Sequence, residues 1–285
     1  MIVQRSSSKT RTLVIHTGGI GDFLLFCPCL KRLAEEGPVS LAGADRDRLN
    51  LAVVCGIAED AYLLDDIEFG SIFSTPTSRF EKFVAQFDRV VVWMTDDGGQ
   101  IRRALLSAGV SDVRVYAGLP PKDWQLHAGA YYSESLGYKV LPPLVLPFED
   151  DGFAHDAVIH AGSGSGRKNW PIENFVAVAD ALEARGRNVE WILGPAEAGL
   201  EVPHAARVIE VVSVVTLARH LAGTALYIGN DSGVTHLAAA CGCWTVAIFS
   251  VTEPEVWAPR GERVSVVCGE AWPAVNQVIA AVDRT

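Results

Sequence analysis

The first residues that could do chemistry lie in a glycine-rich turn at residues 17–22. The apolar run at 13–16 predicts a strand before the turn, and apolar spacing predicts a helix from Asp22 to about residue 36. Two roles fit a carboxylate at that helix N-terminus. It caps the helix and complements the helix dipole, which the local sequence favours, or it faces a cleft as a general base.

The same turn approaches a dinucleotide-binding fingerprint. Gly19 and Gly21 match the first two glycines of Gly-x-Gly-x-x-Gly, and Asp45 follows roughly 20 residues on, where an acidic residue would bind a ribose. Leu24 replaces the third glycine, which normally lets the helix pack closely on the strand. That bulky residue disfavours a nicotinamide cofactor.

A second loop, residues 160–171, has the composition of a phosphate-binding loop. Its glycines and serines, Ser163 among them, expose backbone N–H groups, and Arg167 and Lys168 add positive charge. It is not a Walker A loop, because Arg167 separates Gly166 from Lys168 and Asn169 stands where Ser or Thr would hold magnesium. A solvated, flexible loop is the alternative interpretation.

A third strand end leads into the segment Leu-Gly-Pro-Ala-Glu at residues 193–197. Glu197 would lie in the first turn of a helix there. That position alone is weak support for a function, because acidic residues favour the first turn of any helix.

A fourth loop, residues 229–236, joins a strand to a helix through a tight polar turn. The N–H groups of Ser232 and Gly233 would point at an anion placed there. Asp231, Ser232 and His236 also suggest a serine hydrolase, but the segment is no Gly-x-Ser-x-Gly elbow and is too short for a relay. His236 is either a buried core histidine or a ligand contact.

No metal site is expected. Asp45 and Asp47 have the Asp-x-Asp spacing of metal-dependent sugar transferases, but a helix follows and no histidine partner is evident, so helix capping is favoured. Four of the six cysteines form Cys-Pro-Cys and Cys-Gly-Cys, which lack the two-residue gap of zinc knuckles. Buried, inert thiols are expected.

Apolar runs that alternate with helical patterns predict an α/β fold with parallel sheets covered on both faces. The alternation breaks at residues 140–147, a proline-rich stretch that reads as an extended linker, and then restarts. We therefore predict two Rossmann-like domains, residues 1–147 and 148–285. Their sheets would face each other across a cleft, where small molecules often bind.

Composition excludes several classes of protein. With 49% apolar and 20% charged residues the chain is ordinary globular protein, and its net charge of −10 argues against a nucleic-acid partner. No apolar run is long enough to span a bilayer, and the polar start argues against export. A cytoplasmic location is expected.

Taken together, the four loops resemble the heptosyltransferases of lipopolysaccharide inner-core synthesis, glycosyltransferase family 9, which have a GT-B fold and use ADP-heptose. The resemblance implies that Asp22 is the catalytic base and that Lys168 binds the diphosphate. It also implies that Glu197 binds the ribose of the nucleotide. The segment 230–237 is similar to the family's Asp-Thr/Ser-Gly-x-x-His signature, the most specific of the four motifs.

The resemblance implies an inverting, metal-independent transfer of heptose to a hydroxyl of a lipopolysaccharide-core-like acceptor. The enzyme would need no cofactor beyond the ADP-sugar and at most peripheral contact with the inner face of the inner membrane. Residues 1–147 would hold the acceptor and residues 148–285 the nucleotide sugar. The expected nucleotide-sugar contacts are Gly21, Ser163, Arg167, Lys168, Glu197, Asp231, Ser232, Gly233 and His236.

The chain departs from the family in two respects. It is shorter than usual, and the Lys168 loop is unusually rich in glycine. These departures leave open a transferase or epimerase for another nucleotide sugar, or a non-catalytic nucleotide-binding relative.

Overall fold

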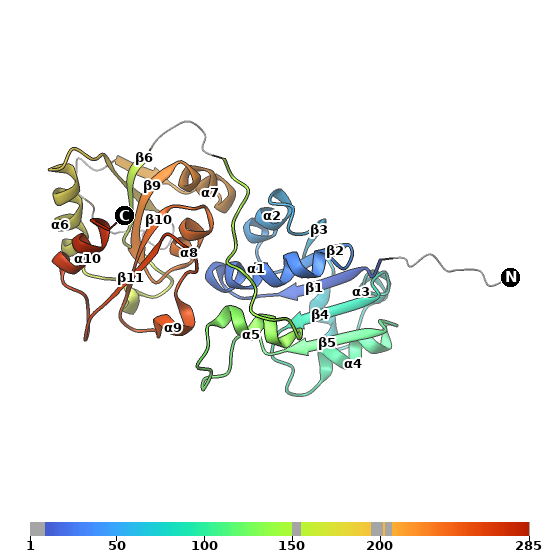
Figure 1. The fold of residues 1–285 in the computed structure, drawn as a ribbon. Helices are drawn as coiled ribbons and strands as arrows, with labels where there is room; N and C mark the ends of the chain where they lie inside the picture. The colour runs from blue at the N-terminus through green and yellow to red at the C-terminus, as the bar shows by residue number, and fades with distance from the viewer. Residues whose placement is uncertain (1–8, 150–154, 195–201, 203–206, 285) are drawn as a thin grey trace. The chain divides into compact units, whose positions relative to one another are not determined.

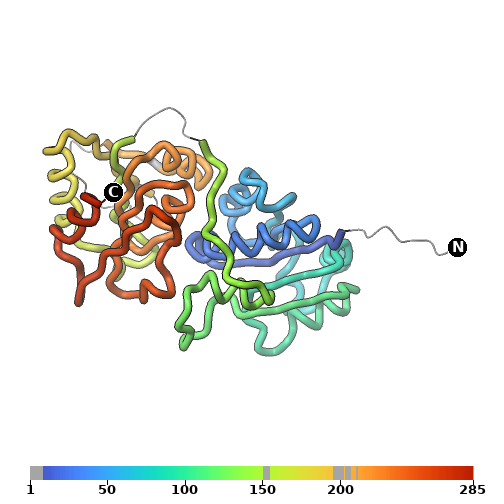
Figure 2. Tube along the Cα trace, in the orientation of Figure 1, coloured from blue at the N-terminus to red at the C-terminus, as the bar shows by residue number. Residues whose placement is uncertain are grey.

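The computed structural model describes residues 9–149, 155–194, 202 and 207–284, and Figures 1 and 2 trace the chain. The chain divides into two compact units. The first comprises Met1–Gly18, Phe26–Asp123 and Tyr132–Lys139; the second comprises Gly19–Leu25, Trp124–Tyr131 and Val140–Thr285. The domain boundary at residue 147 stays a prediction.

The first unit is built on a five-stranded parallel sheet in the order β3-β2-β1-β4-β5. The strands are β1 (Thr12–His16), β2 (Val39–Gly43), β3 (Asp60–Leu63), β4 (Arg89–Trp93) and β5 (Asp112–Tyr116). Its helices are α2 (Arg46–Val54), α3 (Ser78–Val84) and α4 (Gln100–Ser107), with a 3-10 helix η1 at Phe69–Phe73. The residues of α1 (Ile20–Ala34) and α5 (Ala128–Ser135) are divided between the two units. The strand predicted at residues 13–16 and the helix predicted after the glycine turn are confirmed as β1 and α1.

The continuous apolar runs explain why β1 and β4 are central. Every residue of β1 is buried, and Val14 pairs with Val91 in parallel register. A strand covered on both faces needs no polar alternation. The chain leaves β1 toward β2 on one side and later continues to β4 on the other, so the strand order reverses beside the turn that starts α1.

The second unit holds a six-stranded parallel sheet in the order β11-β10-β9-β6-β7-β8. Its strands are β6 (His155–His160), β7 (Val189–Leu193), β8 (Arg207–Glu210), β9 (Thr224–Asn230), β10 (Trp244–Phe249) and β11 (Val264–Cys268). Its helices are α6 (Ile172–Glu183), α7 (Val214–Ala222), α8 (Gly233–Ala240), α9 (Pro254–Trp257) and α10 (Val275–Val282), with a 3-10 helix η2 at Gly166–Lys168. No helix among the described residues is long and apolar enough to cross a membrane.

This strand order determines which loops meet. From β6 the chain moves outward through β7 and β8, then returns to β9 on the other side of β6. The reversal lies between β6 and β9, whose carboxyl ends are adjacent because His160 pairs with Gly229. Ligands of open α/β sheets bind at such a reversal, outside the carboxyl ends of the strands. The glycine loop after β6 and the polar turn after β9 therefore share one edge.

The cysteines are free thiols, and three of them, Cys27, Cys29 and Cys243, are buried. Burial raises the pKa of Cys29 to about 12 and that of Cys243 to about 12. Thiols with such pKa values stay protonated at neutral pH, and a protonated thiol is a poor nucleophile and metal ligand. The three buried thiols thus have the inert character that the sequence predicts.

His16, the last residue of β1, is buried among aromatic rings. It stacks on Phe26 with ring centroids 4.7 Å apart and meets the edge of Tyr132 at 5.9 Å. Burial, with a smaller contribution from the Arg48 guanidinium, lowers the pKa of His16 to about 3. The imidazole therefore stays neutral in the folded protein at any mild pH.

His16→Gln is expected to make the protein less sensitive to acid. Below pH 6.5, the ordinary histidine pKa, the unfolded chain binds a proton that the folded chain refuses until about pH 3, so stability falls as pH falls. This residue should account for up to about 2.5 kcal/mol of the loss in unfolding free energy between pH 7 and about pH 4.5. Urea unfolding of both proteins at the two pH values measures it, and equal losses in both would contradict the assignment.

Candidate functional site

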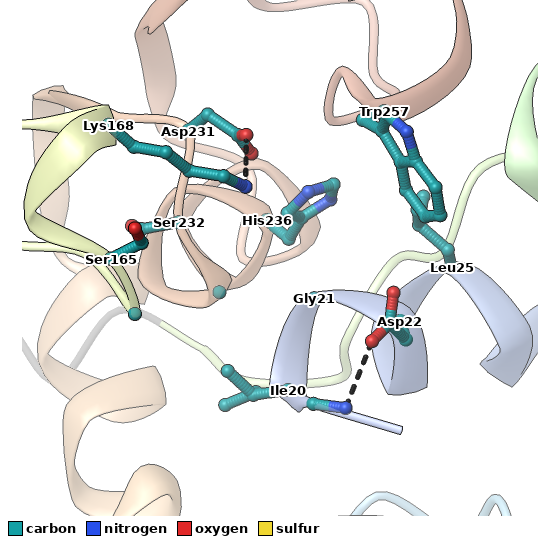
Figure 3. Close-up of a pocket in the computed structure, with 13 residues that line it drawn as sticks. Ile20, Gly21, Asp22, Leu25, Ser165, Lys168, Asp231, Ser232, His236 and Trp257 are labelled. Carbon is teal, nitrogen blue, oxygen red and sulfur yellow. Dashed lines mark hydrogen bonds and ion pairs between the residues drawn. The ribbon is translucent and has the colours of Figure 1, made fainter. Parts of the chain in front are cut away.

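A pocket of about 370 Å³ lies in the second unit, where the loops after β6 and β9 meet the start of α1 (Figure 3). This volume is within the range of small-molecule sites. The residues that line it are Gly19, Ile20, Gly21, Asp22, Leu25, Gly164, Ser165, Lys168, Asp231, Ser232, Gly233, His236 and Trp257. Three of the four loops that the sequence singled out therefore contribute to one cavity.

The side chain of Asn230, at the end of β9, holds the glycine loop in place. It is fully buried, its amide donates to the Ala161 carbonyl at 2.7 Å, and its carbonyl oxygen accepts the Trp170 N–H at 2.9 Å. Trp170 is itself buried and donates its indole N–H to the Pro273 carbonyl at 3.0 Å. Both ends of the loop that carries Lys168 are thus fixed to the neighbouring strand and the core.

Lys168 and Asp231 form an ion pair inside the pocket. The Lys168 Nζ lies 2.6 Å from Asp231 Oδ2, the contact drawn dashed in Figure 3. The Thr252 hydroxyl donates to the same carboxylate oxygen. Asp231 is nearly buried, whereas Lys168 keeps about a third of its side chain exposed. The lysine is therefore aimed at the pocket by a carboxylate that is itself held in place.

Two helix N-termini reach the pocket. Ser232 is the N-cap of α8, and its hydroxyl accepts the Thr235 N–H. Ile20 begins α1. The first N–H groups of a helix have no intrahelical partner and carry the positive end of its dipole, so each terminus favours an anion. With Lys168 beside them, these termini make the pocket suited to a phosphate group.

Glycine is required where the two helix N-termini approach each other within the second unit. A Cβ on Gly233 would lie 1.8 Å from Ile20 Cγ2 and 3.1 Å from the Gly21 backbone nitrogen. A Cβ on Gly21 would lie 3.2 Å from His236 Cδ2. These predicted site residues therefore have a packing role, because even one methyl group would displace a neighbour.

Asp22 caps its helix and also lines the pocket. Its Oδ2 accepts the Gly19 N–H at 3.0 Å, so the carboxylate reaches back to the residue that precedes the helix. This is one half of a capping box. The same side chain lines the pocket (Figure 3). The cap therefore fixes the orientation of a carboxylate that a ligand can meet.

His236 is buried at the pocket wall, one turn into α8. Burial lowers its pKa to about 4, although the nearby Asp231 and a hydrogen bond with the Trp257 backbone raise it in part. The imidazole is therefore neutral at physiological pH and offers the pocket a polar but uncharged wall. Trp257, the last residue of α9, lines the same pocket.

The remaining predicted contacts do not line the pocket. Ser163 is buried, and its hydroxyl lies 2.7 Å from the Ser165 carbonyl and 2.6 Å from the Asn169 side-chain oxygen, so it shapes the loop from within. Arg167 is exposed in η2. Glu197 lies outside the described residues. Their roles in nucleotide binding stay predictions.

Sequence reasoning missed several residues of the site. Gly164 and Ser165 lie within the predicted loop but were not singled out, and Ile20 and Leu25 are apolar residues of α1. Thr252, in the loop after β10, donates its hydroxyl to Asp231. The two residues are 21 positions apart in the sequence, so this contact has no local sequence signal.

Gly233→Ala is expected to destabilise the protein, because the new methyl group overlaps Ile20 and presses on the backbone of Gly21. A loss of about 1–3 kcal/mol in unfolding free energy is typical of such overpacking. Gly164 lines the same pocket, but nothing lies within 4 Å of the point where an added Cβ would lie, so Gly164→Ala is the matched control. The double variant with Ile20→Ala should recover part of the loss. Equal stability of both alanine variants would disprove the close approach.

Residues 148–282 match the family model of glycosyltransferase family 9 (heptosyltransferase). No curated protein sequence matches the chain significantly. Solved structures match nearly its whole length at low sequence identity, which establishes a shared fold.

Three of these structures define the fold. The glycosyl transferase family 9 protein from Veillonella parvula has a TM-score of 0.76 and 17% identity, over 97% of each chain. The ADP-heptose lps heptosyltransferase II of E. coli has a TM-score of 0.72 and 16% identity, over 96% of this chain and 98% of that one. The E. coli heptosyltransferase WaaC, solved with ADP, has a TM-score of 0.67 and 16% identity, over 96% and 99%.

These structures have the GT-B fold, so the predicted fold class, α/β with two parallel sheets, is confirmed. The family model covers the half of the chain that supplies Lys168, Asp231 and His236 to the pocket. Residues 148–282 therefore form a glycosyltransferase family 9 (heptosyltransferase) domain, and the chain as a whole shares the fold of the solved structures.

Proposed function

We propose that this protein is a glycosyltransferase that moves heptose from ADP-heptose to a hydroxyl group of a lipopolysaccharide-core-like acceptor, with inversion at the anomeric carbon. The observation that carries the proposal is the arrangement of Lys168, Asp231 and the α8 N-terminus around one pocket, with the Asp22 carboxylate on its wall. A solved relative of the same fold holds ADP.

The departing nucleotide must be stabilised as it gains negative charge. Fixed donors aimed at the developing charge supply much of the rate enhancement in such reactions. Lys168 and the N–H groups at the start of α8 are donors of this kind, and the hydrogen bonds of Asn230 hold their loops before the substrate arrives. We propose that they do this work without a metal ion and without a cofactor beyond the sugar nucleotide.

Asp22 is the proposed general base. It would take the proton of the acceptor hydroxyl while that oxygen attacks the anomeric carbon from the side opposite the diphosphate, and this geometry inverts the centre. General-base assistance contributes about 10²–10⁴-fold to such steps. We further propose that residues 1–147 bind the acceptor, that residues 148–285 bind the nucleotide sugar, and that the enzyme works in the cytoplasm at the inner membrane face.

Lys168→Ala is expected to weaken ADP binding by about 10- to 100-fold while leaving adenosine binding nearly unchanged, because a charge-assisted hydrogen bond to the diphosphate is lost. Isothermal titration calorimetry measures both ligands. Arg167→Ala is the neighbouring control and should lose much less, since Arg167 is exposed and does not line the pocket.

Part of the Lys168→Ala effect should come from Asp231, whose charge is then left uncompensated beside the diphosphate. Adding Asp231→Asn to Lys168→Ala should therefore restore some ADP affinity. An ADP affinity that is the same in wild type and Lys168→Ala would remove Lys168 from the phosphate site.

Asp22→Asn is expected to lower turnover by about 10²–10⁴-fold with ADP affinity within a few-fold of wild type. Asparagine keeps an oxygen that can accept the Gly19 N–H, so the cap survives while the base is lost. Sugar transfer, assayed with ADP-, UDP- and GDP-sugars, and ADP titration separate the two effects. Asp22→Ala, which also removes the cap, is the control for stability.

Equal loss of turnover and of ADP binding in Asp22→Asn would point to a purely structural carboxylate. The same assays on the wild type separate the transferase from its alternatives. Release of free sugar would favour a hydrolase, and an epimerised donor would favour an epimerase. Binding without turnover would favour a non-catalytic relative.

A further inference from the structure

Three potential metal ligands meet at the edge of the second unit's sheet opposite the pocket. His155 is the first residue of β6, Glu190 lies near the start of β7, and His220 lies in the last turn of α7. The pocket residues follow the carboxyl ends of β6 and β9, whereas this cluster lies at the amino ends of the strands. It is therefore separate from the proposed catalytic site.

The three potential ligand atoms of the cluster lie close together. The Glu190 Oε2 lies 3.0 Å from His155 Nδ1 and 3.1 Å from His220 Nε2. All three atoms lie within 4.8 Å of one another. Ligand atoms at the corners of a tetrahedron with bonds of about 2.0–2.1 Å are about 3.3 Å apart. The two glutamate–histidine distances would have to lengthen by a few tenths of an ångström to admit an ion, and the two imidazole nitrogens, which lie within 4.8 Å of each other, would have to take up the same spacing.

The surroundings hold the Glu190 side chain in one orientation. Its side chain is only 4% exposed, and its other oxygen, Oε1, lies 2.9 Å from the Arg207 Nε. A buried carboxylate needs such a partner. Because Arg207 holds Oε1, the second oxygen is left facing the two imidazoles, which is the role that an outer partner plays for a metal ligand.

The two imidazoles lie against each other in a tilted arrangement. Their ring centroids lie 3.8 Å apart with an interplanar angle of 33°. His155 is 12% exposed and His220 19% exposed, so the cluster is shielded but can be reached by a small ion. The packing fixes the rings beforehand, which lowers the entropy cost of collecting two ligands around an ion.

We propose that His155 Nδ1, Glu190 Oε2 and His220 Nε2 bind one divalent transition-metal ion of the zinc type. Two imidazole nitrogens and one carboxylate oxygen are ligands that zinc accepts, and water would complete a tetrahedral site. The ion would tie β6, β7 and α7 together on the side of the sheet away from the pocket. Its role is structural, so it is compatible with a metal-free transfer step.

The test is zinc binding to the full-length, tag-free protein, measured by competition with a chromophoric chelator. The wild type is expected to bind one tight Zn²⁺ per chain. His155→Asn and His220→Gln should each weaken this binding at least about 100-fold, since losing even an outer partner of a ligand costs about 10–100-fold. Cys268→Ser, which removes an exposed thiol elsewhere, should bind as the wild type does.

Cobalt substitution of the wild type tests the ligand set without any variant. The expected spectrum has the visible bands of four-coordinate Co²⁺ and no thiolate-to-cobalt charge-transfer band. Circular dichroism of the metal-free variants confirms that they are folded. The proposal is overturned if wild-type protein binds Zn²⁺ no more tightly than the histidine variants, if Cys268→Ser loses the site, or if the cobalt spectrum shows thiolate ligation.

Discussion

The pocket depends on the buried side chain of Asn230. Its amide and its carbonyl oxygen bind the backbone at both ends of the glycine loop, at Ala161 and at Trp170. Each such bond contributes only about 1 kcal/mol net, but removing one partner would leave a buried polar group unsatisfied, which costs more. A loop so rich in glycine would otherwise be mobile. The two Asn230 hydrogen bonds hold the loop in place, so that Lys168 lies beside Asp231 before any ligand binds.

The strand order places Asn230, at the end of β9, next to the glycine loop that follows β6. β6 and β9 are neighbours although about 70 residues separate the two loops in sequence, because the chain fills the β7 and β8 side first and then returns. Residues of the two loops thus meet through pairing of His160 with Gly229. At the opposite, amino ends of the strands, His155 of β6 and Glu190 of β7 lie side by side.

The sequence predicted the central strands and the helices that follow the loops well, because long apolar runs and glycine turns are local signals. β7 ends at the segment 193–197 and α8 follows the polar turn of the loop 229–236, as the sequence predicts. The edge strands β3 and β11 went unpredicted, since half-exposed strands of this length carry neither an apolar run nor clear alternation. Motif chemistry identified Lys168 and Asp231. It could not predict the contact of Thr252 with Asp231 or the ligand cluster at Glu190, because these pairs form only through the tertiary fold.

The ion pair between Lys168 and Asp231 also bears on which ligands suit the pocket. A simple anion that took Lys168 would leave the Asp231 carboxylate, nearly buried, without its cation, and that loss would oppose binding. A ligand that brings a phosphate to Lys168 and hydroxyl groups to Asp231 satisfies both partners at once. A sugar diphosphate carries a hydroxyl group on the carbon next to the anomeric carbon, close to the diphosphate, whereas the hydroxyl groups of a nucleoside diphosphate lie farther away, on the ribose. This asymmetry supports a nucleotide sugar, rather than the nucleotide by itself, as the ligand that the proposed function requires.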